Sequence, residues 1–492
     1  MKYYSTRDPK KQKYDSAEVI KMGLAPDGGL FIPEAIPSLT KTDILELCAM
    51  SYPERAAKIL SMFLSDYTYD ELLSDCMAAY SETSFPGGAA PLVKVTDSLY
   101  SLELWHGPTA AFKDMALQIM PRLLSRALVK TGEDNTALIL VATSGDTGKA
   151  ALEGYKDIDR IKIMVFYPVD GVSKVQKLQM ATQTGNNVNV CAIRGNFDDA
   201  QTGVKKIFSD SEAAAKLLEN SYILSSANSI NWGRLAPQIV YYVSAYCDML
   251  NANTLEYGET VNVCVPTGNF GNIFAAYIAK LMGVPLNKLI CASNANNVLT
   301  DFLSEGTYDR NRAFHMTMSP SMDILISSNL ERLLCFTAGE EKTAGYMAEL
   351  SKVGKYTVDV ETKAEIDKNF IGFCADEATT SKTVKKYYQE NGYLADTHTS
   401  VALACAENYL EQFNDGKKII VASTASPYKF AADVYKSITD NCAKSDTEAL
   451  DQLSELTGTE VTYPLRNLTE RKINFDTVID PSQMLDEVYK FM

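Results

Sequence analysis

The sequence predicts an α/β fold in which parallel sheets are covered by helices and preceded by a mainly helical N-terminal domain. From about residue 96 onward, short runs rich in β-branched residues, such as "TALILVA", "KIMVFYP" and "VNVCVP", alternate with helical stretches. This alternation is typical of parallel strands joined by helices. Before residue 96, apolar residues recur at helical spacing in "SAEVIKMGL", "TDILELCAM" and "PERAAKILSMFL", separated by breaks such as "APDGGLFIP".

These patterns divide the 492 residues into three regions. We expect residues 1–95 to form the mainly helical N-terminal domain and residues 96–437 to form the α/β region. Residues 438–492 are acidic and weakly periodic, which predicts a peripheral C-terminal segment. In α/β folds ligands bind at the carboxyl ends of strands, so the loops that follow the strands are the places to search for a site.

Composition and charge exclude several classes of function. A net charge of -15 argues against nucleic acid as a partner, because nucleic-acid binding needs clustered Lys and Arg. The three histidines lie far apart and the ten cysteines include no CxxC pair, so we expect no metal site and reduced thiols. No run approaches 18 apolar residues and the N-terminus lacks an apolar targeting segment, which predicts a cytoplasmic protein without a membrane anchor.

The first strand-to-helix loop carries Lys113. In "SLYSLELWHGPTAAFKDMALQIMPRLLSRAL" we expect a strand, the turn "HGPT" and a helix that Pro121 kinks. Lys113 then lies near a helix N-terminus, where the helix dipole disfavours a cation. The residue is either a solvated lysine or, in a partly desolvated cationic site, a nucleophile that forms a Schiff base with an aldehyde.

The second loop, "VATSGDTGKAA", follows the strand "TALIL" and imitates a P-loop. The P-loop pattern needs Gly at position 143 and a hydroxyl residue at position 150, but the sequence has Thr143 and Ala150. The hydroxyl groups of Thr143, Ser144 and Thr147, together with helix N-terminal amides, suit a small anion such as a carboxylate. An ordinary Ser/Thr-rich helix cap is the alternative.

The third loop, "GNFGN" at residues 268–272, lies between the strand "VNVCVP" and a helix. Gly268 and Gly271 have no side chains, so the backbone can wrap around a phosphate before the helix begins. A simple tight turn is the alternative. The loop lacks the GxGxxG pattern of dinucleotide-binding folds.

Two later loops add polar groups. In "SSANSINWGRLAPQ", Asn228 and Ser229 offer neutral donors, and Arg234 offers a planar fork that suits phosphate. The alternative is a turn whose arginine caps a neighbouring element. In "VASTASPYKFA", Ser423 and Thr424 end the strand "KKIIV", and a hydroxyl there faces a ring nitrogen or caps a helix.

Pyridoxal phosphate and a phosphorylated amino-acid substrate would together use all five loops. The chain also resembles the threonine synthase family, in its longer form, along nearly its whole length, through "YYSTRD", "DGGLFIP", "HGPTAAFKD", "ATSGDTG", "SANSIN", "PTGNFGN", "SPSMDILISSNLERLL" and "TASPYKF". The resemblance implies pyridoxal-phosphate fold type II, the tryptophan synthase β-like fold. Two parallel-sheet-containing domains are then expected, with a smaller α/β subdomain at about residues 135–235 inserted in the larger one.

The resemblance also implies roles for individual residues. The residues that would contact the cofactor are Lys113, which would carry it covalently, Gly268, Asn269, Phe270, Gly271 and Asn272 around its phosphate, Asp146 near its 3-oxygen and Thr424 facing its ring nitrogen. The residues that would bind substrate are Thr143, Ser144, Thr147, Asn228, Ser229 and Arg234. The sequence has Thr397 where some members have Pro before the histidine that corresponds to His398, so the local backbone there is expected to differ.

The activity that the resemblance implies is the last step of threonine biosynthesis. O-phosphohomoserine and water would give threonine and phosphate by γ-elimination followed by β-replacement. A related phospholyase with the same motifs would instead give 2-oxobutyrate. Outside pyridoxal enzymes, the broken P-loop pattern argues against an NTPase, and Lys113 with the glycine loop argues against a silent binding protein. The sequence leaves open whether the protein is a monomer or a homodimer.

Overall fold

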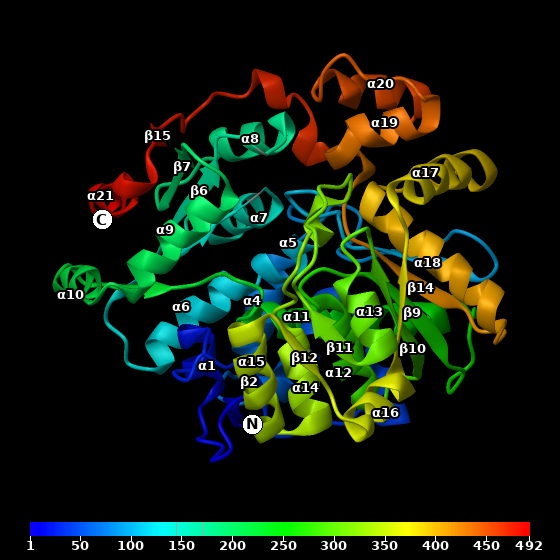
Figure 1. Cartoon of the computed structure of the whole chain (residues 1–492), viewed down its shortest axis with the longest axis horizontal. Helices are drawn as coiled ribbons and strands as arrows, with labels where there is room; N and C mark the ends of the chain where they lie inside the picture. Colours follow the sequence, from blue (N-terminus) through cyan, green and yellow to red (C-terminus); the bar gives the residue numbers. More distant parts are fainter. Residues whose placement is uncertain (144, 171) are drawn as a thin grey trace.

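A six-stranded sheet forms the larger part of the α/β region (Figure 1). The computed structural model describes residues 1–143, 145–170 and 172–492. The strand order is β13-β10-β9-β14-β4-β3, and every neighbouring pair is parallel except β3 with β4. The strands are β3 (Leu92–Lys94), β4 (Leu99–Glu103), β9 (Val261–Pro266), β10 (Leu286–Ser293), β13 (Phe370–Cys374) and β14 (Ile419–Ser423).

A second, five-stranded sheet is parallel throughout, with the order β15-β7-β6-β5-β8. The strands are β5 (Thr136–Ala142), β6 (Ile161–Pro168), β7 (Val188–Ile193), β8 (Tyr222–Ser225) and β15 (Val478–Ile479). The apolar runs "TALILVA" and "KIMVFYP" are mostly buried, as expected for parallel strands covered on both faces. The predicted α/β class with parallel sheets is confirmed.

Helices connect and cover these strands. Those between β4 and β10 are α5 (Lys113–Leu117), α6 (Met120–Lys130), α7 (Asp146–Tyr155), α8 (Lys174–Ala181), α9 (Phe197–Ser209), α10 (Ser211–Glu219), α11 (Trp232–Asn251) and α12 (Gly271–Leu281). Those between β10 and β14 are α13 (Val298–Glu305), η1 (Pro320–Met322), α14 (Leu330–Ala338), α15 (Glu340–Val353), α16 (Val360–Asn369), α17 (Glu377–Asn391) and α18 (Thr397–Phe413), with the antiparallel pair β11 (Thr307–Asp309) and β12 (Lys355–Thr357).

The helix expected around Pro121 is two helices. α5 ends at Leu117 and α6 begins at Met120, so Pro121 lies in the first turn of α6. Proline is tolerated there because the first amides of a helix have no partner inside it. The result is a clean break between the two helices rather than a kink within one.

The N-terminal region contains α1 (Ser16–Met22), α2 (Lys41–Cys48), α3 (Tyr52–Phe63) and α4 (Tyr69–Ala79). All four of these helices begin with a reciprocal capping pair, such as Thr40 with Asp43. The segment "APDGGLFIP", expected to be only a break, also contains the strand β2 (Phe31–Pro33), which pairs antiparallel with β1 (Tyr3–Ser5). Three-residue strands are too short to show a period of two in the sequence.

Arg332 fastens the N-terminal region to the α/β region. Its guanidinium is fully buried and donates to the carbonyl oxygens of Phe31 (3.0 Å) and Ile230 (2.5 Å) and to the side chain of Asn329. Burial lowers the pKa of this guanidinium to about 9. Three separate segments of the chain therefore converge on one buried cation.

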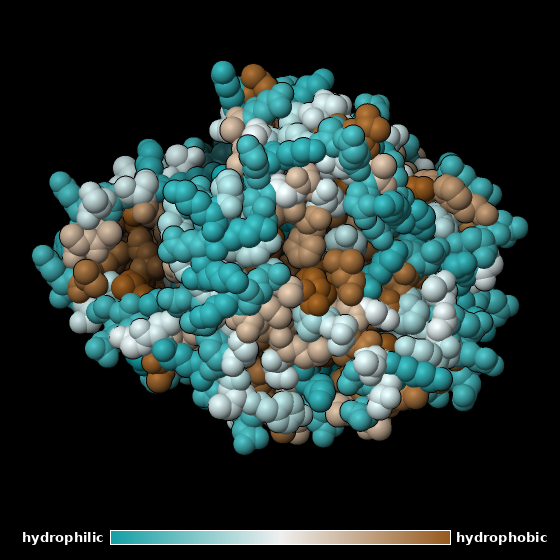
Figure 2. Space-filling view, turned by 90° about the horizontal axis from the view of Figure 1, so that it is seen from below, coloured by the Kyte–Doolittle hydropathy of each residue, from teal (hydrophilic) through white to brown (hydrophobic). Residues whose placement is uncertain are grey.

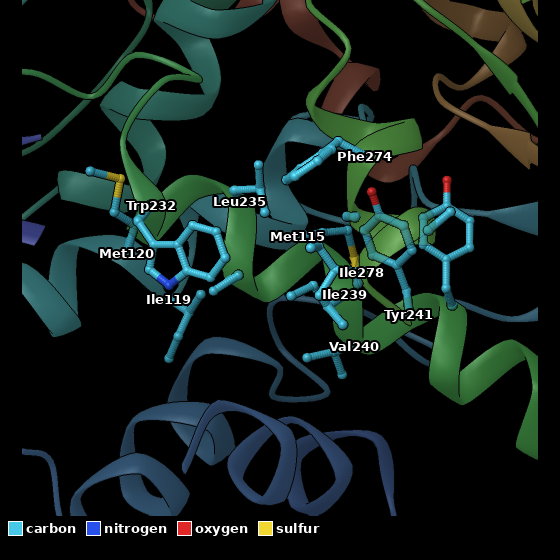
Figure 3. Close-up of a cluster of buried hydrophobic side chains, with 14 of the residues drawn as sticks. Met115, Ile119, Met120, Trp232, Leu235, Ile239, Val240, Tyr241, Phe274 and Ile278 are labelled. Atoms are coloured by element: carbon cyan, nitrogen blue, oxygen red, sulfur yellow. The ribbon is translucent and has the colours of Figure 1, made fainter. Parts of the chain in front are cut away.

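Helix α11 runs through the centre of the molecule, and most of its residues are buried. Burial of nearly all its residues, polar ones such as Arg234 and Gln238 included, places this helix inside the core. Figure 3 shows side chains of α11 packed against those of α5, α6 and α12. The residues labelled there are Met115, Ile119, Met120, Trp232, Leu235, Ile239, Val240, Tyr241, Phe274 and Ile278.

The segment predicted to be peripheral lies along the outside of the α/β region (Figure 1). It follows η2 (Pro427–Phe430) and α19 (Ala431–Thr439), and contains α20 (Glu448–Thr457), η3 (Tyr463–Leu465), η4 (Leu468–Glu470), η5 (Pro481–Gln483) and α21 (Met484–Phe491). Its strand β15 forms one edge of the five-stranded sheet.

Most of the face seen in Figure 2 is hydrophilic, with apolar residues in separate patches. Across the described residues, no helix has the length and apolarity to cross a membrane.

Candidate active site

Three neighbouring strands of the larger sheet bring the predicted site residues together. The order β9-β14-β4 places side by side the loop 268–272 after β9, Thr424 after β14 and Lys113 after β4. The backbone N–H of Phe112 donates to the carbonyl oxygen of Thr424 at 2.8 Å. The carboxyl ends of parallel strands therefore define the site, as the α/β pattern predicts.

Lys113 begins α5, and its side chain is 13% exposed. The ammonium nitrogen Nζ lies 3.6 Å from Oδ2 of Asp146 and 3.4 Å from Oγ of Ser321. Burial lowers the pKa of Lys113; Asp146 opposes this change, while the charges of Lys429 and Arg234 add to it. A lysine with a lowered pKa is a better nucleophile and base near neutral pH than an exposed lysine.

Asp146 comes from the smaller sheet, where it begins α7 after β5. Its Oδ1 is 3.1 Å from Nζ of Lys429 and accepts a hydrogen bond from Nε2 of Gln176 at 2.7 Å. Burial acts to raise the pKa of Asp146, but the charges of Lys429 and Lys113 and the Gln176 hydrogen bond hold it well below its ordinary value. Asp146 is thus an anion shared by two lysines.

The loop 268–272 has its carbonyl groups held from outside. Ser327 Oγ donates to the carbonyl of Gly268 at 2.6 Å, and the backbone and side-chain amides of Asn329 donate to the carbonyl of Asn269, both at 3.0 Å. Phe270 has a φ of +63° and buries its ring in the core. Among the described residues, the backbone N–H groups of 268–272 have no acceptor. They are available to an anion at the N-terminus of α12.

Gly268 has little room for a side chain. A Cβ atom on Gly268 would lie 2.7 Å from the carbonyl oxygen of Ser321. At Gly271 the nearest atom would be Nδ2 of Asn329 at 3.3 Å. The close approach at Gly268 joins the loop to the segment that faces Lys113.

Asn272 presents an oriented donor at the same place. Its Oδ1 accepts hydrogen bonds from the hydroxyls of Tyr241 and Tyr242, both at 2.6 Å. This fixes the amide, and its Nδ2 is buried without a partner among the described residues. A buried donor without a partner is costly, so it marks a place where a ligand acceptor fits. Together with the free amides of the loop, this donor fits a cofactor phosphate.

Arg234 lies on α11, and 3% of its surface is exposed. Its Nη1 donates to the carbonyl oxygen of Ala227 at 2.6 Å, whereas its Nε is buried without a partner in the described part of the chain. Burial lowers its pKa to about 10. Asn228 and Ser229 lie on the preceding loop, where Asn228 is exposed and Ser229 is partly exposed. An arginine with unused donors and two accessible polar residues can bind an oxyanion.

The loop after β5 uses one of its hydroxyls internally. Thr143 Oγ1 accepts hydrogen bonds from the backbone N–H groups of Gly145 and Gly148, both at 3.0 Å. Thr147 is partly exposed. Ser144 lies outside the residues that the structure describes. The Thr143 hydroxyl therefore caps the turn, which was the alternative raised for this loop.

His398 orients the segment that faces Lys113. Its Nδ1 is 2.7 Å from Oδ2 of Asp396, and its Nε2 accepts a hydrogen bond from the backbone N–H of Ser321 at 3.1 Å. Thr397, for which the family resemblance implied a local difference from members with Pro, is the first residue of α18 and donates to the carbonyl of Met318 at 2.6 Å. Proline is common at this helix position, so the backbone accommodates either residue.

The sequence interpretation missed Lys429, Ser321 and Gln176. Lys429 lies in "TASPYKF" and Ser321 in "SPSMDIL", two motifs that resemble the family, but neither residue was assigned a role. Both contact groups more than 200 residues away in the chain. The available signal was a lysine in a family motif directly after a predicted strand. No cluster of three His, Cys, Asp or Glu side chains that could hold a metal is present among the described residues.

Comparison with known families gives two matches. Residues 2–80 match the family described as "Threonine synthase N terminus". Residues 85–425 match the family described as "Pyridoxal-phosphate dependent enzyme". The second match contains the whole of the geometry described above around Lys113, apart from Lys429.

Individual relatives give the same picture. Threonine synthase of Pseudomonas aeruginosa is 37% identical over 445 residues, which cover 89% of this chain and 90% of the relative. Human threonine synthase-like 1 is 39% identical over 440 residues, and this chain spans only 58% of its length. The crystal structure of pyridoxal-phosphate-bound threonine synthase from Brucella melitensis superposes with a TM-score of 0.88 at 36% identity, covering 100% of this chain and 99% of that one. The expected fold type II is thereby confirmed.

Proposed function

The chain belongs to the threonine synthase family of pyridoxal-phosphate-dependent enzymes, and from this premise we propose that it converts O-phosphohomoserine and water to threonine and phosphate. One observation at the site supports the proposal. Lys113 lies beside the anion Asp146, at the same sheet edge as a loop whose amides have no acceptor among the described residues and can bind a phosphate. That combination suits a phosphorylated aldehyde cofactor.

Pyridoxal phosphate, when bound, supplies an aldehyde that takes up the substrate amine and a conjugated ring that spreads negative charge. We propose that Lys113 holds it covalently and that Gly268, Asn269, Gly271, Asn272 and the backbone of Phe270 hold its phosphate. Thr424 would face the ring nitrogen with a neutral hydroxyl. Asp146 would lie near the 3-oxygen, where the charge of Lys429 offsets that of the carboxylate.

Lys113 is also the proposed base. When Lys113 is not bound to the cofactor, its amine can take the proton from the substrate Cα and later return that proton. Its lowered pKa supports this role, because a lysine must be partly neutral at working pH to accept a proton. The hydroxyl of Ser321, 3.4 Å from Nζ, can orient that amine.

Substrate binding is proposed for two loops. Arg234, with Asn228 and Ser229, would hold the phosphate that leaves from Cγ. The loop of Thr143, Ser144 and Thr147 would receive the substrate carboxylate, with Thr143 shaping the turn and Thr147 supplying a hydroxyl. A charged fork suits the doubly charged phosphate, and neutral groups suit the carboxylate. The proposal includes a cytoplasmic location, which the ten free cysteines support.

The test is product analysis with O-phosphohomoserine as substrate and homoserine as the unphosphorylated control. We expect equal amounts of threonine and phosphate, and almost no turnover of homoserine. 2-Oxobutyrate as the main product would instead indicate a phospholyase, and absence of phosphate release would refute both activities. Borohydride reduction followed by peptide mapping should find the cofactor on Lys113; a label on another lysine would refute the assignment of that residue.

A further inference from the structure

Lys113 and Lys429 lie on opposite sides of one carboxylate, but they are held very differently. The side chain of Lys429 is 0% exposed, and besides its contact with Asp146 it donates to the carbonyl oxygen of Thr109 at 2.8 Å. The side chain of Lys113 is 13% exposed, and its distance to Asp146 is 3.6 Å rather than 3.1 Å. Lys429 is therefore fixed in place, whereas Lys113 is the partner that can leave.

The two lysines also use different oxygens of Asp146. Oδ1 contacts Lys429 and Gln176, whereas Oδ2 faces Lys113 and the hydroxyl of Ser321 at 3.4 Å. A buried carboxylate without a cation is strongly disfavoured. If Lys113 were the only cation near Asp146, its reaction with the cofactor would leave the carboxylate unpaired. Alternatively, Asp146 would hold Lys113 in its protonated form and oppose that reaction.

We infer that Lys429 is the permanent counter-ion of Asp146 and, through Asp146, a positioning residue that controls how readily Lys113 gives up its proton. The inference rests on the proposed function in one respect, namely that Lys113 is the lysine that reacts with the cofactor. Lys429 makes its contacts with protein groups, Asp146 and Thr109, and acts on the reacting amine by its charge and through Asp146.

The charge balance around Lys113 gives the direction of the effect. Lys429 repels the protonated form of Lys113 and competes for the same anion, so both influences favour the neutral amine. The other charged or titratable groups that surround the pair are Arg234 on α11, Asp114 on α5, and His398 with Asp396 at the start of α18. Among the charged groups of the described residues, only Lys429 and Lys113 lie within 4 Å of the carboxylate of Asp146.

The test measures the protonation of Lys113 directly in the full chain freed of cofactor. Limiting formaldehyde with cyanoborohydride methylates neutral amines, and mass spectrometry of the Lys113 peptide gives the extent of labelling at each pH. The exposed Lys444 in the same sample is the internal reference. In Lys429→Met we expect the midpoint of the Lys113 profile to move upward by about one pH unit or more, because one nearby positive charge is lost.

Two further variants keep the inference testable if Lys429→Met folds poorly. Lys429→Arg retains the charge, so its Lys113 profile should stay within about 0.3 pH unit of the wild-type profile. Asp146→Asn leaves two lysines without their shared anion, so its profile should move downward. Thermal melts followed by circular dichroism identify variants that are folded at the labelling temperature.

Specific outcomes would overturn the inference. An unchanged midpoint in folded Lys429→Met would show that Lys429 only holds the backbone at Thr109 and has no effect on the protonation of Lys113. An unchanged or raised midpoint in Asp146→Asn would show that the carboxylate does not transmit the effect. Failure of the proposed function is distinguishable, because it would appear as a borohydride label on a lysine other than 113, whereas failure of this inference would appear only in the methylation profiles.

Discussion

The two strand-to-helix loops that the sequence marked as anion sites satisfy their backbones in opposite ways. After β5, the hydroxyl of Thr143 accepts hydrogen bonds from the backbone N–H groups of Gly145 and Gly148, so these donors are used within the turn. After β9, Ser327 and Asn329 donate to the carbonyls of the loop 268–272, whose N–H groups have no acceptor in the part of the chain that the structure describes. A loop is prepared to bind an anion when the rest of the protein supports its carbonyls, whatever its local composition.

The largest expected effect tests whether the loop after β5 takes the substrate phosphate in place of Arg234. Losing a bidentate partner of a buried anion costs several kcal/mol, so Arg234→Ala should lower kcat/KM for O-phosphohomoserine on the order of 10²-fold or more. Steady-state phosphate release measures it. Arg234→Lys is the control and should recover only part of the loss, because it restores charge without the fork. An unchanged kcat/KM in Arg234→Ala would indicate that the loop after β5, and not Arg234, binds the substrate phosphate.

The next effect tests the loop after β9. In Gly268→Val, the new side chain meets the carbonyl of Ser321 and displaces the free amides. Losing two charge-assisted hydrogen bonds should weaken pyridoxal phosphate binding on the order of 10²-fold, as measured by absorbance titration. Gly271→Ala, where the nearest atom is at 3.3 Å, is the matched control and should bind within roughly threefold of wild type. Wild-type affinity in Gly268→Val would place the phosphate elsewhere.

A smaller effect sharpens the role of Asn272. Asn272→Asp keeps an oxygen for Tyr241 and Tyr242 to donate to, but replaces the unpartnered Nδ2 with a second oxygen. Binding of pyridoxal phosphate should weaken roughly tenfold, since a donor becomes an acceptor with negative charge. The same absorbance titration checks this. Tighter binding in the variant would mean that the amide does not face the phosphate.

The smallest effect on binding is expected in the loop after β5. Thr143→Val keeps the shape of the side chain but leaves the N–H groups of Gly145 and Gly148 without their acceptor. We expect a loss of about 2 kcal/mol in the free energy of unfolding, from denaturant titration, with cofactor affinity within roughly threefold of wild type. A large loss of affinity without loss of stability would show that this hydroxyl serves a ligand instead of the turn.

The sequence predicted those parts of the molecule that depend on local pattern. The run "TALILVA" is β5 from its first residue to its last, and "VNVCVP" is β9, because a buried parallel strand is a continuous apolar segment. The short strands β1, β2 and β15 carry no such pattern, since two or three residues cannot show a period. Their pairing is decided by distant partners.

The site divides along the same line. Lys113 and the loop 268–272 were identifiable because each follows a predicted strand and carries a compact motif. The environment of Asp146 was not, because Lys429, Gln176 and Ser321 reach it from three separate elements. Whether Thr143 serves a ligand or the turn also depended on hydrogen bonds that no spacing rule contains.

Arg332 has a consequence for exchanging parts between relatives. The family boundary between residues 80 and 85 invites chimaeras that take the N-terminal part from one homologue and the remainder from another. Such a splice cuts across the hydrogen bonds that join the guanidinium to Phe31 on one side and to Ile230 and Asn329 on the other. The homologue that supplies the N-terminal part must therefore place a backbone carbonyl oxygen where that of Phe31 lies in this chain. Otherwise the chimaera contains a buried guanidinium that has lost one of its three acceptors, close to loops that we propose to bind ligands.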